Sequence, residues 1–232
     1  MTHLRLAIIV PVLNEALAIE AALARLATLR QRGARVVVVD GGSTDATVER
    51  VRLHADRVLQ SVRGRGAQMN AGATAAIDDG ADVLLFLHAD CVLPNAADQL
   101  IENALGSHRA WGRFDVRIDG EPRMLRIVSA LMNWRSRLTG ICTGDQAIFI
   151  TRGAFQQLGG FALIPLMEDV DFCKRAKAIS RPIALRAQVS TSGRRWQQNG
   201  VWRTIVLMWV FRIAYFFGAD PERLARRYDN AR

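Results

Sequence analysis

The 232-residue chain has few cysteines, and their arrangement argues against several classes of protein. Cys91, Cys142 and Cys173 are an odd number scattered along the sequence, and none has the CxxC or Cys/His spacing of a metal site. Neither a disulfide framework nor a structural zinc centre is indicated. Free thiols favour a reducing compartment, so we predict a cytoplasmic protein.

Long apolar runs are also missing. No stretch of 18 uncharged apolar residues exists, and the closest segment, residues 204–219, is interrupted by Arg212. A membrane-spanning helix is therefore not expected. The apolar N-terminal run is cut short by Pro11 and Asn14, and no small-residue cleavage site follows it. This run predicts a first β-strand rather than a signal peptide.

Lysine is nearly absent, although the chain is basic. Lys and Arg total 31 against 22 Asp and Glu, which gives a formal charge of +9, and almost all of the bases are arginines. Arginine favours forked contacts to phosphate or carboxylate, so a phosphorylated ligand, an anionic lipid surface and nucleic acid are all candidates. With two tyrosines and no recognised binding motif, we expect no nucleic-acid partner.

Apolar strands alternate with helical stretches along the first half of the chain. Strands are predicted at 6–12, 36–40 and 82–88, and helices at 15–33, 41–51, 64–80 and 94–105. Asn14 is a candidate N-cap of the first helix and Gly33 its C-cap, and Thr44 or Asp45 is a candidate N-cap of the second. This order predicts an α/β fold with a mainly parallel sheet covered by helices on both faces.

Polar residues follow three of the predicted strands. Asn14 and Glu15, then Asp40, then Asp90 each come at a carboxyl end. Ligands bind at that edge of open α/β sheets, so we expect a common site there. Helix capping or turn formation remains an alternative for any one of these residues taken alone.

Six segments carry a resemblance to a known family. They are IIVPVLNEA (8–16), VVVVDGGSTDAT (36–47), RGRGAQMNAGA (63–73), LLFLHADCVLP (84–94), GDQAIFITRGAFQQLGGF (144–161) and MEDVDFCKR (167–175). In order and spacing they resemble family 2 glycosyltransferases, over about residues 4–200. Within that family the chain is most similar to the short bacterial members named for arsenosugar biosynthesis.

The resemblance implies a fold and a division of the chain. The expected fold is the GT-A type, a Rossmann-like mixed, mainly parallel sheet with helices on both faces. Residues 1–200 would form the nucleotide-sugar transferase domain. Residues 201–232 would form a C-terminal helical appendage that is apolar and basic.

The resemblance also implies a donor site at the ends of the first strands. The residues that it assigns to the nucleoside-diphosphate sugar there are Pro11, Asn14, Glu15, Asp40, Gly41, Arg65 and Gln68. Asp40 would accept a hydrogen bond from the base or ribose, and Gly41 would let the backbone pass close to the ligand, where a Cβ would intrude.

A third implied feature is a metal site. The family's Asp-x-Asp motif corresponds here to His88-Ala89-Asp90, with Asp90 as the ligand of Mn²⁺ or Mg²⁺, because phosphate oxygens complete the shell of such an ion. His88 and Ala89 would border the donor. Three roles stay open for His88, which are a contact to the ribose, ligation of Mn²⁺, or capping of the strand.

The remaining implied site residues lie in the second half of the chain. Asp169 would be the general base at the start of a helix, and Glu168 would orient a partner or the acceptor. Asp145 would contact a hydroxyl, and Arg194 and Trp196, with Arg195 between them, would close over the diphosphate. The alternatives are acids that complement a helix dipole and arginines that face solvent.

The function that follows is inverting transfer of one sugar to a hydroxyl acceptor, either a small molecule or a lipid-linked one. A sugar nucleotidyltransferase and a non-catalytic nucleic-acid or nucleotide-binding protein are the alternatives. Three roles are open for the apolar C-terminal helix: it would contact a membrane surface, form a homodimer interface, or pack under the sheet. Contact with a membrane would make this cytoplasmic protein peripheral on the inner membrane face.

Overall fold

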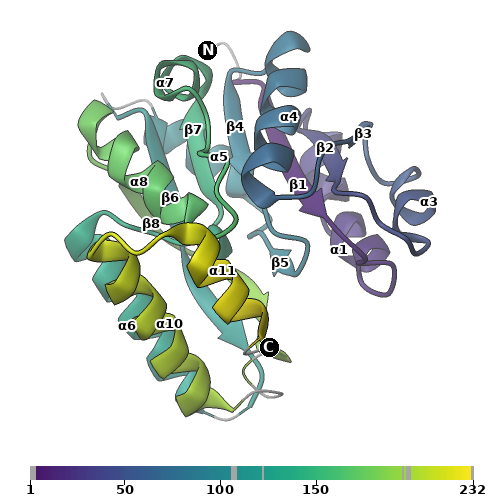
Figure 1. The fold of residues 1–232 in the computed structure, drawn as a ribbon. Coiled ribbons are helices and arrows are strands. Elements are labelled where there is room, and N and C mark those ends of the chain that lie inside the picture. The colour runs from purple at the N-terminus through teal and green to yellow at the C-terminus, as the bar shows by residue number, and fades with distance from the viewer. Residues whose placement is uncertain (1–3, 106–108, 122, 195, 197–199, 231–232) are drawn as a thin grey trace.

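The computed structural model describes residues 4–105, 109–121, 123–194, 196 and 200–230. Within these residues, eight strands form one sheet in the order β3-β2-β1-β4-β7-β6-β8-β5 (Figure 1). The strands are β1 (Leu6–Val12), β2 (Arg35–Asp40), β3 (Arg57–Gln60), β4 (Val83–Phe86), β5 (Cys91–Val92), β6 (Trp111–Asp119), β7 (Ile148–Thr151) and β8 (Ile183–Ser192).

The half of the sheet that contains β1, β2, β3 and β4 is parallel. β1 pairs in parallel with β2 and β4, and β2 with β3. β7 then runs antiparallel to both β4 and β6, whereas β6 and β8 are parallel. The predicted mixed, mainly parallel sheet is therefore confirmed. β1, β2 and β4 are buried along almost their whole length, which explains their continuous apolar sequences.

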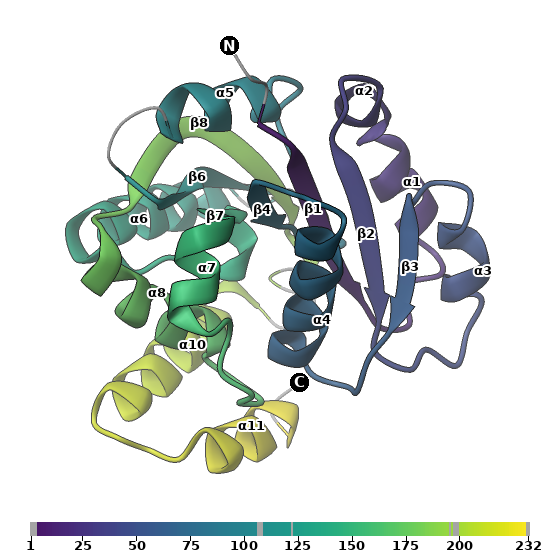
Figure 2. The same ribbon diagram turned by 90° about the horizontal axis from the view of Figure 1, so that it is seen from above.

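Helices cover both faces of this sheet (Figure 2). One apolar core joins one face to α1 (Ile19–Ala24), α2 (Ala27–Gln31), α3 (Thr47–Val51) and α5 (Ala97–Leu105). A second core joins the other face to α4 (Arg65–Asp78), α7 (Arg152–Leu158) and α8 (Glu168–Ile179). The predicted helices on both faces are thus present.

Local boundaries differ from the sequence prediction at two helix starts. The predicted 15–33 helix is split into α1 and α2, and α1 begins after Ala18. Asn14 is not its N-cap, because the Asn14 side chain instead accepts a hydrogen bond from the backbone N–H of Thr44 at 2.9 Å. The N-cap of α3 is Ala46 rather than Thr44 or Asp45. Gly33 follows α2 with a φ of 98°, as a C-terminal glycine should.

The residues predicted as a C-terminal appendage form α10 (Val201–Phe216) and α11 (Pro221–Asn230). α10 lies beside α6 (Met124–Thr139), and α11 lies across the start of α8 (Figure 1). Phe211 and Leu224 share a buried cluster with Met167 and Val170 of the α8 region. Among the described helices, none is long and apolar enough to cross a membrane.

Candidate active site

A cavity of about 120 Å³ lies where the turn after β4, the short helix η1 (Gly144–Gln146) and the start of α8 meet. α10 and α11 supply part of its wall. The lining residues that bear on chemistry are Arg65, His88, Asp90, Thr143, Gly144, Asp145, Glu168, Asp169, Thr191, Trp196, Arg212 and Tyr228. Residues from Arg65 to Tyr228, far apart in the chain, are therefore brought to one site.

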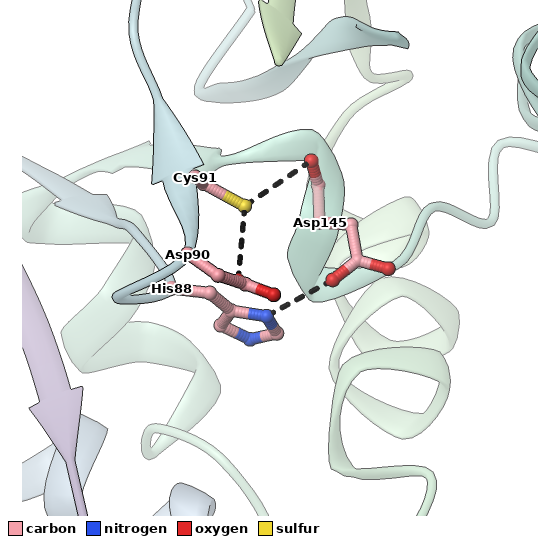
Figure 3. Close-up of side chains that lie close together, drawn as sticks. All are labelled: His88, Asp90, Cys91 and Asp145. Carbon is pink, nitrogen blue, oxygen red and sulfur yellow. Dashed lines mark hydrogen bonds and ion pairs between the residues drawn. The ribbon is translucent and has the colours of Figure 1, made fainter. Parts of the chain in front are cut away.

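The turn between β4 and β5 carries His88 and Asp90. The four residues of β4 are buried, so the strand fixes the position at which this turn emerges. His88 Nδ1 lies 3.1 Å from Asp145 Oδ1 of η1. Figure 3 shows His88, Asp90, Cys91 and Asp145 grouped around one point, with the Cys91 thiol 3.7 Å from Asp90 Oδ1.

These four residues form a candidate metal site. One ligand atom from each of them lies within 4.8 Å of the others. Burial, with the nearby charges of Asp145 and Asp90, raises the pKa of the Cys91 thiol well above its ordinary value. A soft sulfur ligand also suits Mg²⁺ or Mn²⁺ less well than oxygen does, so Cys91 is the weakest candidate of the four. His88, Asp90 and Asp145 remain as nitrogen and oxygen donors. Carboxylate oxygens suit Mg²⁺ or Mn²⁺, so the donor set fits the predicted ion.

Asp145 is part of this group, although the sequence suggested for it only a contact to a hydroxyl. The sequence signal was its place in the Gly144-Asp145-Gln146 segment, but 57 positions separate Asp145 from His88. Their pairing depends on the antiparallel alignment of β7 with β4. That alignment could not be deduced from the sequence pattern alone.

Glu168 and Asp169 open α8 from the other side of the cavity. Asp169 Oδ2 accepts the backbone N–H of Gly144 at 3.0 Å, and Oδ1 accepts that of Val170 at 2.7 Å. Burial raises the pKa of Asp169, and these two amides oppose the rise. Burial and the neighbouring Asp169 raise the pKa of Glu168 to about 6, against the opposing charge of Arg65. Glu168 is buried and Asp169 half-buried at the start of α8, and the predicted difference in their roles stays a prediction.

Gly144 connects the two halves of the cavity. Its N–H binds Asp169, and a Cβ at this position would lie 2.2 Å from Nε2 of His88. Only glycine leaves room for the imidazole here while it supplies an amide to the carboxylate. The sequence placed Gly144 next to the site but gave no reason for its identity.

Two residues that were predicted to bind the sugar donor, Asp40 and Gln68, form side-chain hydrogen bonds within the protein. Asp40 is 1% exposed, and its carboxylate accepts hydrogen bonds from the backbone N–H groups of Gly42 and Ser43 at 3.0 Å. Gln68 donates its side-chain amide to the carbonyls of Val12 and Val39. Both residues hold the carboxyl ends of β1 and β2 in place, and neither lines the cavity. Their contact with the donor stays a prediction.

Gly41 lies against Gln68, since a Cβ on this glycine would be 3.0 Å from the Gln68 amide. Pro11 is half-buried in β1, Asn14 is exposed after it, and Ala89 is buried in the turn after β4. None of these residues lines the cavity. They border the β1, β2 and β4 ends, and their predicted contacts to the donor are not tested.

Two of the predicted basic and aromatic residues, Arg65 and Trp196, line the cavity. Arg194 does not line it and donates a hydrogen bond to Ser192 Oγ at 3.2 Å. Glu15 is half-buried, and burial together with the charge of Asp90 raises its pKa, while Arg194 and Arg65 act in the opposite direction. Glu15, just after β1, is thus within electrostatic reach of the Asp90 carboxylate. Arg195 lies outside the described residues.

The family of the chain follows from its sequence profile. The profile of glycosyl transferase family 2 matches residues 7–157, which is more than half of the chain. The chain belongs to glycosyl transferase family 2. The matched region contains the turn with His88 and Asp90 and the η1 segment with Asp145, whereas Glu168, Asp169 and the cavity residues from α10 and α11 lie beyond it.

One curated relative matches part of the chain. Succinoglycan biosynthesis protein ExoA of Rhizobium meliloti (strain 1021) is 38% identical over 108 residues, which cover 43% of the chain and 32% of ExoA. The chain thus matches about a third of the length of that relative. The finer placement among arsenosugar-related members stays a prediction.

Solved glycosyltransferase structures share the fold. A mannosyltransferase, PcManGT from Pyrobaculum calidifontis, in complex with GDP-Man and Mn²⁺, has a TM-score of 0.63 and 22% identity, over 98% of this chain and 69% of that one. S. aureus TarS 1-349 in complex with UDP-GlcNAc has a TM-score of 0.64 and 20% identity, over 82% of this chain and 58% of that one. The GT-A fold is confirmed.

The raised pKa of Glu168 makes the stability of the protein depend on pH. The folded pKa is about 6 against an ordinary 4.5, so folding favours the protonated carboxyl. The stabilisation of the folded state by protonated Glu168 is complete below pH 4.5 and is lost as the pH rises through 6. At pH 8 the ionised group then costs about 2 kcal/mol of folding free energy.

We therefore expect Glu168→Gln to raise the free energy of unfolding at pH 8 by up to about 2 kcal/mol, and by clearly less at pH 5. Urea denaturation at both pH values measures the difference. The control is Glu49→Gln on the exposed side of α3, which should change little at either pH. An equal effect of Glu168→Gln at both pH values would show that Glu168 has an ordinary pKa.

Proposed function

We propose that this glycosyltransferase moves one sugar from a nucleoside-diphosphate sugar to a hydroxyl acceptor, with inversion at the anomeric carbon and the help of a divalent cation. The observation that supports this most directly is that Asp90 and Asp169 border one cavity. A cation-binding carboxylate and a proton acceptor are the two groups that such a transfer needs.

The side of the cavity that would bind the leaving diphosphate is formed by the turn after β4. His88, Asp90 and Asp145 would hold the cation, because their ligand atoms cluster there. A bound Mn²⁺ or Mg²⁺ supplies positive charge against the charge that develops on the departing diphosphate. Arg65 lines the same cavity and would add a second positive charge to this region.

The acceptor side is formed by the start of α8. Asp169 would take the proton of the attacking hydroxyl, and the amides of Gly144 and Val170 hold its carboxylate in one orientation. The burial that raises its pKa makes the carboxylate a better proton acceptor. Glu168, on the same turn and adjacent in sequence, would orient Asp169 or the acceptor.

Solved structures of similar fold support a nucleoside-diphosphate sugar as the donor. PcManGT is in complex with GDP-Man and Mn²⁺, and TarS is in complex with UDP-GlcNAc. Nucleoside diphosphates of different bases therefore bind to proteins of this fold. For this chain, a nucleoside-diphosphate sugar is accordingly the first class of donor to test.

A thermal-shift screen of UDP-, GDP- and dTDP-sugars, each with and without Mn²⁺, tests the proposal. A donor at 100 times its Kd stabilises the folded state by about 2.7 kcal/mol, which corresponds to a rise in Tm of about 5–10 °C for a chain of this size. We expect one nucleotide class to give such a rise only with Mn²⁺. If no nucleotide sugar shifts the Tm while duplex DNA does, the protein is a nucleic-acid binder instead.

A further inference from the structure

The outer face of α6 is apolar and unpartnered in the described structure. Ile127, Leu131, Trp134 and Leu138 are 54–66% exposed. Their spacing of four, three and four residues places them on one side of the helix. The opposite side of α6, with Leu125 and Ser129, packs on β6 and is buried.

α10 has a matching face. Trp202, Val206, Trp209, Ile213 and Phe216 recur at helical spacing and are 51–73% exposed. The inner side of the same helix is different, since Met208, Phe211 and Arg212 line the active-site cavity. α10 therefore separates the cavity from a large apolar surface.

The two exposed faces lie on the same side of a helix pair. Val128 near the start of α6 clusters with Val201 and Ile205 at the start of α10. Ile141, just after α6, clusters with Phe211 in the second half of α10. The helices thus run in the same direction, side by side at the edge of the molecule (Figures 1 and 2). With that direction, the right-handed turn of each helix places both apolar faces on one side of the pair.

Neither helix of this α6/α10 face contains an Asp or Glu. Arg137 of α6 pairs with Asp115 at 2.6 Å, and Arg212 of α10 lines the cavity, so neither belongs to the exposed face. Arg126, and Arg123 just before α6, are exposed. Three of the five tryptophans of the chain, Trp134, Trp202 and Trp209, belong to this face. Exposed tryptophans beside arginines are typical of helices that lie in a lipid–water interface.

We propose that the α6/α10 face docks onto the surface of an anionic phospholipid bilayer, with the two helices parallel to the membrane plane and not across it. A symmetric contact with a second copy would bring the exposed Arg123 and Arg126 of both copies to one interface without acids on α6 or α10 to balance them, which costs free energy. An anionic lipid surface supplies the missing negative charge. Docking in this way would hold the cavity, behind α10, close to the bilayer.

Sedimentation with phospholipid vesicles tests this proposal. We expect the full chain to bind vesicles of phosphatidylglycerol and phosphatidylcholine, to bind pure phosphatidylcholine vesicles at least tenfold more weakly, and to be released in part by salt. The double variant Trp134→Ser/Trp209→Ser should bind the anionic vesicles at least tenfold more weakly than wild type. Leu17→Ser/Leu53→Ser, a matched pair of exposed apolar residues elsewhere, should bind as wild type does.

Two further measurements keep the test decisive. Brominated lipids should quench the tryptophan emission of the wild-type protein, which does not depend on any variant folding correctly. Light scattering in the absence of lipid should give a monomer. Failure to sediment with anionic vesicles, wild-type binding by the tryptophan variant, or a dimer that this variant dissociates would each overturn the proposal. None of these outcomes depends on donor binding, so the proposed transfer reaction is tested separately.

Discussion

Replacing Asp169 with Asn is expected to lower the rate of sugar transfer by about 10²–10⁴-fold while leaving donor binding close to wild type. The amide has nearly the same shape as the carboxylate, and its one oxygen can still accept the N–H of Gly144, although the bond from Val170 is then lost. It cannot accept a proton from the acceptor hydroxyl. The effect should therefore fall on kcat and not on the donor Kd.

The matched control is Asp171→Asn, two residues further along α8. Asp171 pairs with Arg175 at 2.8 Å and does not line the cavity, so its replacement should leave kcat near wild type. Release of nucleoside diphosphate under saturating donor and acceptor measures kcat, and calorimetry measures the donor Kd. Wild-type turnover by Asp169→Asn would show that another group removes the proton.

Replacing Asp90 with Ala is expected to weaken Mn²⁺-dependent binding of the donor at least tenfold. Asp90 is exposed at the turn after β4, so its loss should not disturb the core. It removes one of the three nitrogen and oxygen donors from the cluster with His88 and Asp145. Fewer carboxylates mean weaker affinity for a hard cation and, through the ion, for the diphosphate.

Calorimetric titration of the donor with and without Mn²⁺ separates this effect from a general loss of binding. We expect the Mn²⁺-dependent part of the affinity to be reduced in Asp90→Ala and the remainder to be unchanged. Asp78→Ala, an exposed aspartate at the end of α4, is the control and should titrate as wild type does. Identical curves for wild type and Asp90→Ala would remove Asp90 from the metal site.

The central strands could be predicted from the sequence because burial on both faces requires continuous apolar runs. β1, β2 and β4 are confirmed on this basis. The helix that begins with Glu168 was implied by the family resemblance and is also present. The placement of Asp90 at a strand end followed from the same patterns. Its convergence with Asp169 on one cavity was implied by the family resemblance and is present in the structure.

Other features depended on tertiary contacts that no local pattern encodes. Asn14 looked like a helix cap because a helical pattern follows it, but its side chain holds the distant Thr44 amide instead. Gln68 was expected to face the donor, and its side-chain amide binds the distant Val12 and Val39 carbonyls, while its contact with the donor stays a prediction. The apolar stripes of α6 and α10 were visible in the sequence, but only the packing of the helix pair determines which side stays exposed.

The most direct test of the shared cavity is anomalous diffraction from crystals grown with Mn²⁺ and the nucleoside diphosphate that the thermal-shift screen selects. We predict a manganese peak about 2.0–2.6 Å from the Asp90 carboxylate, with the diphosphate beside it in the cavity that Asp169 lines. A manganese ion or a diphosphate bound away from that cavity would contradict the proposed mechanism.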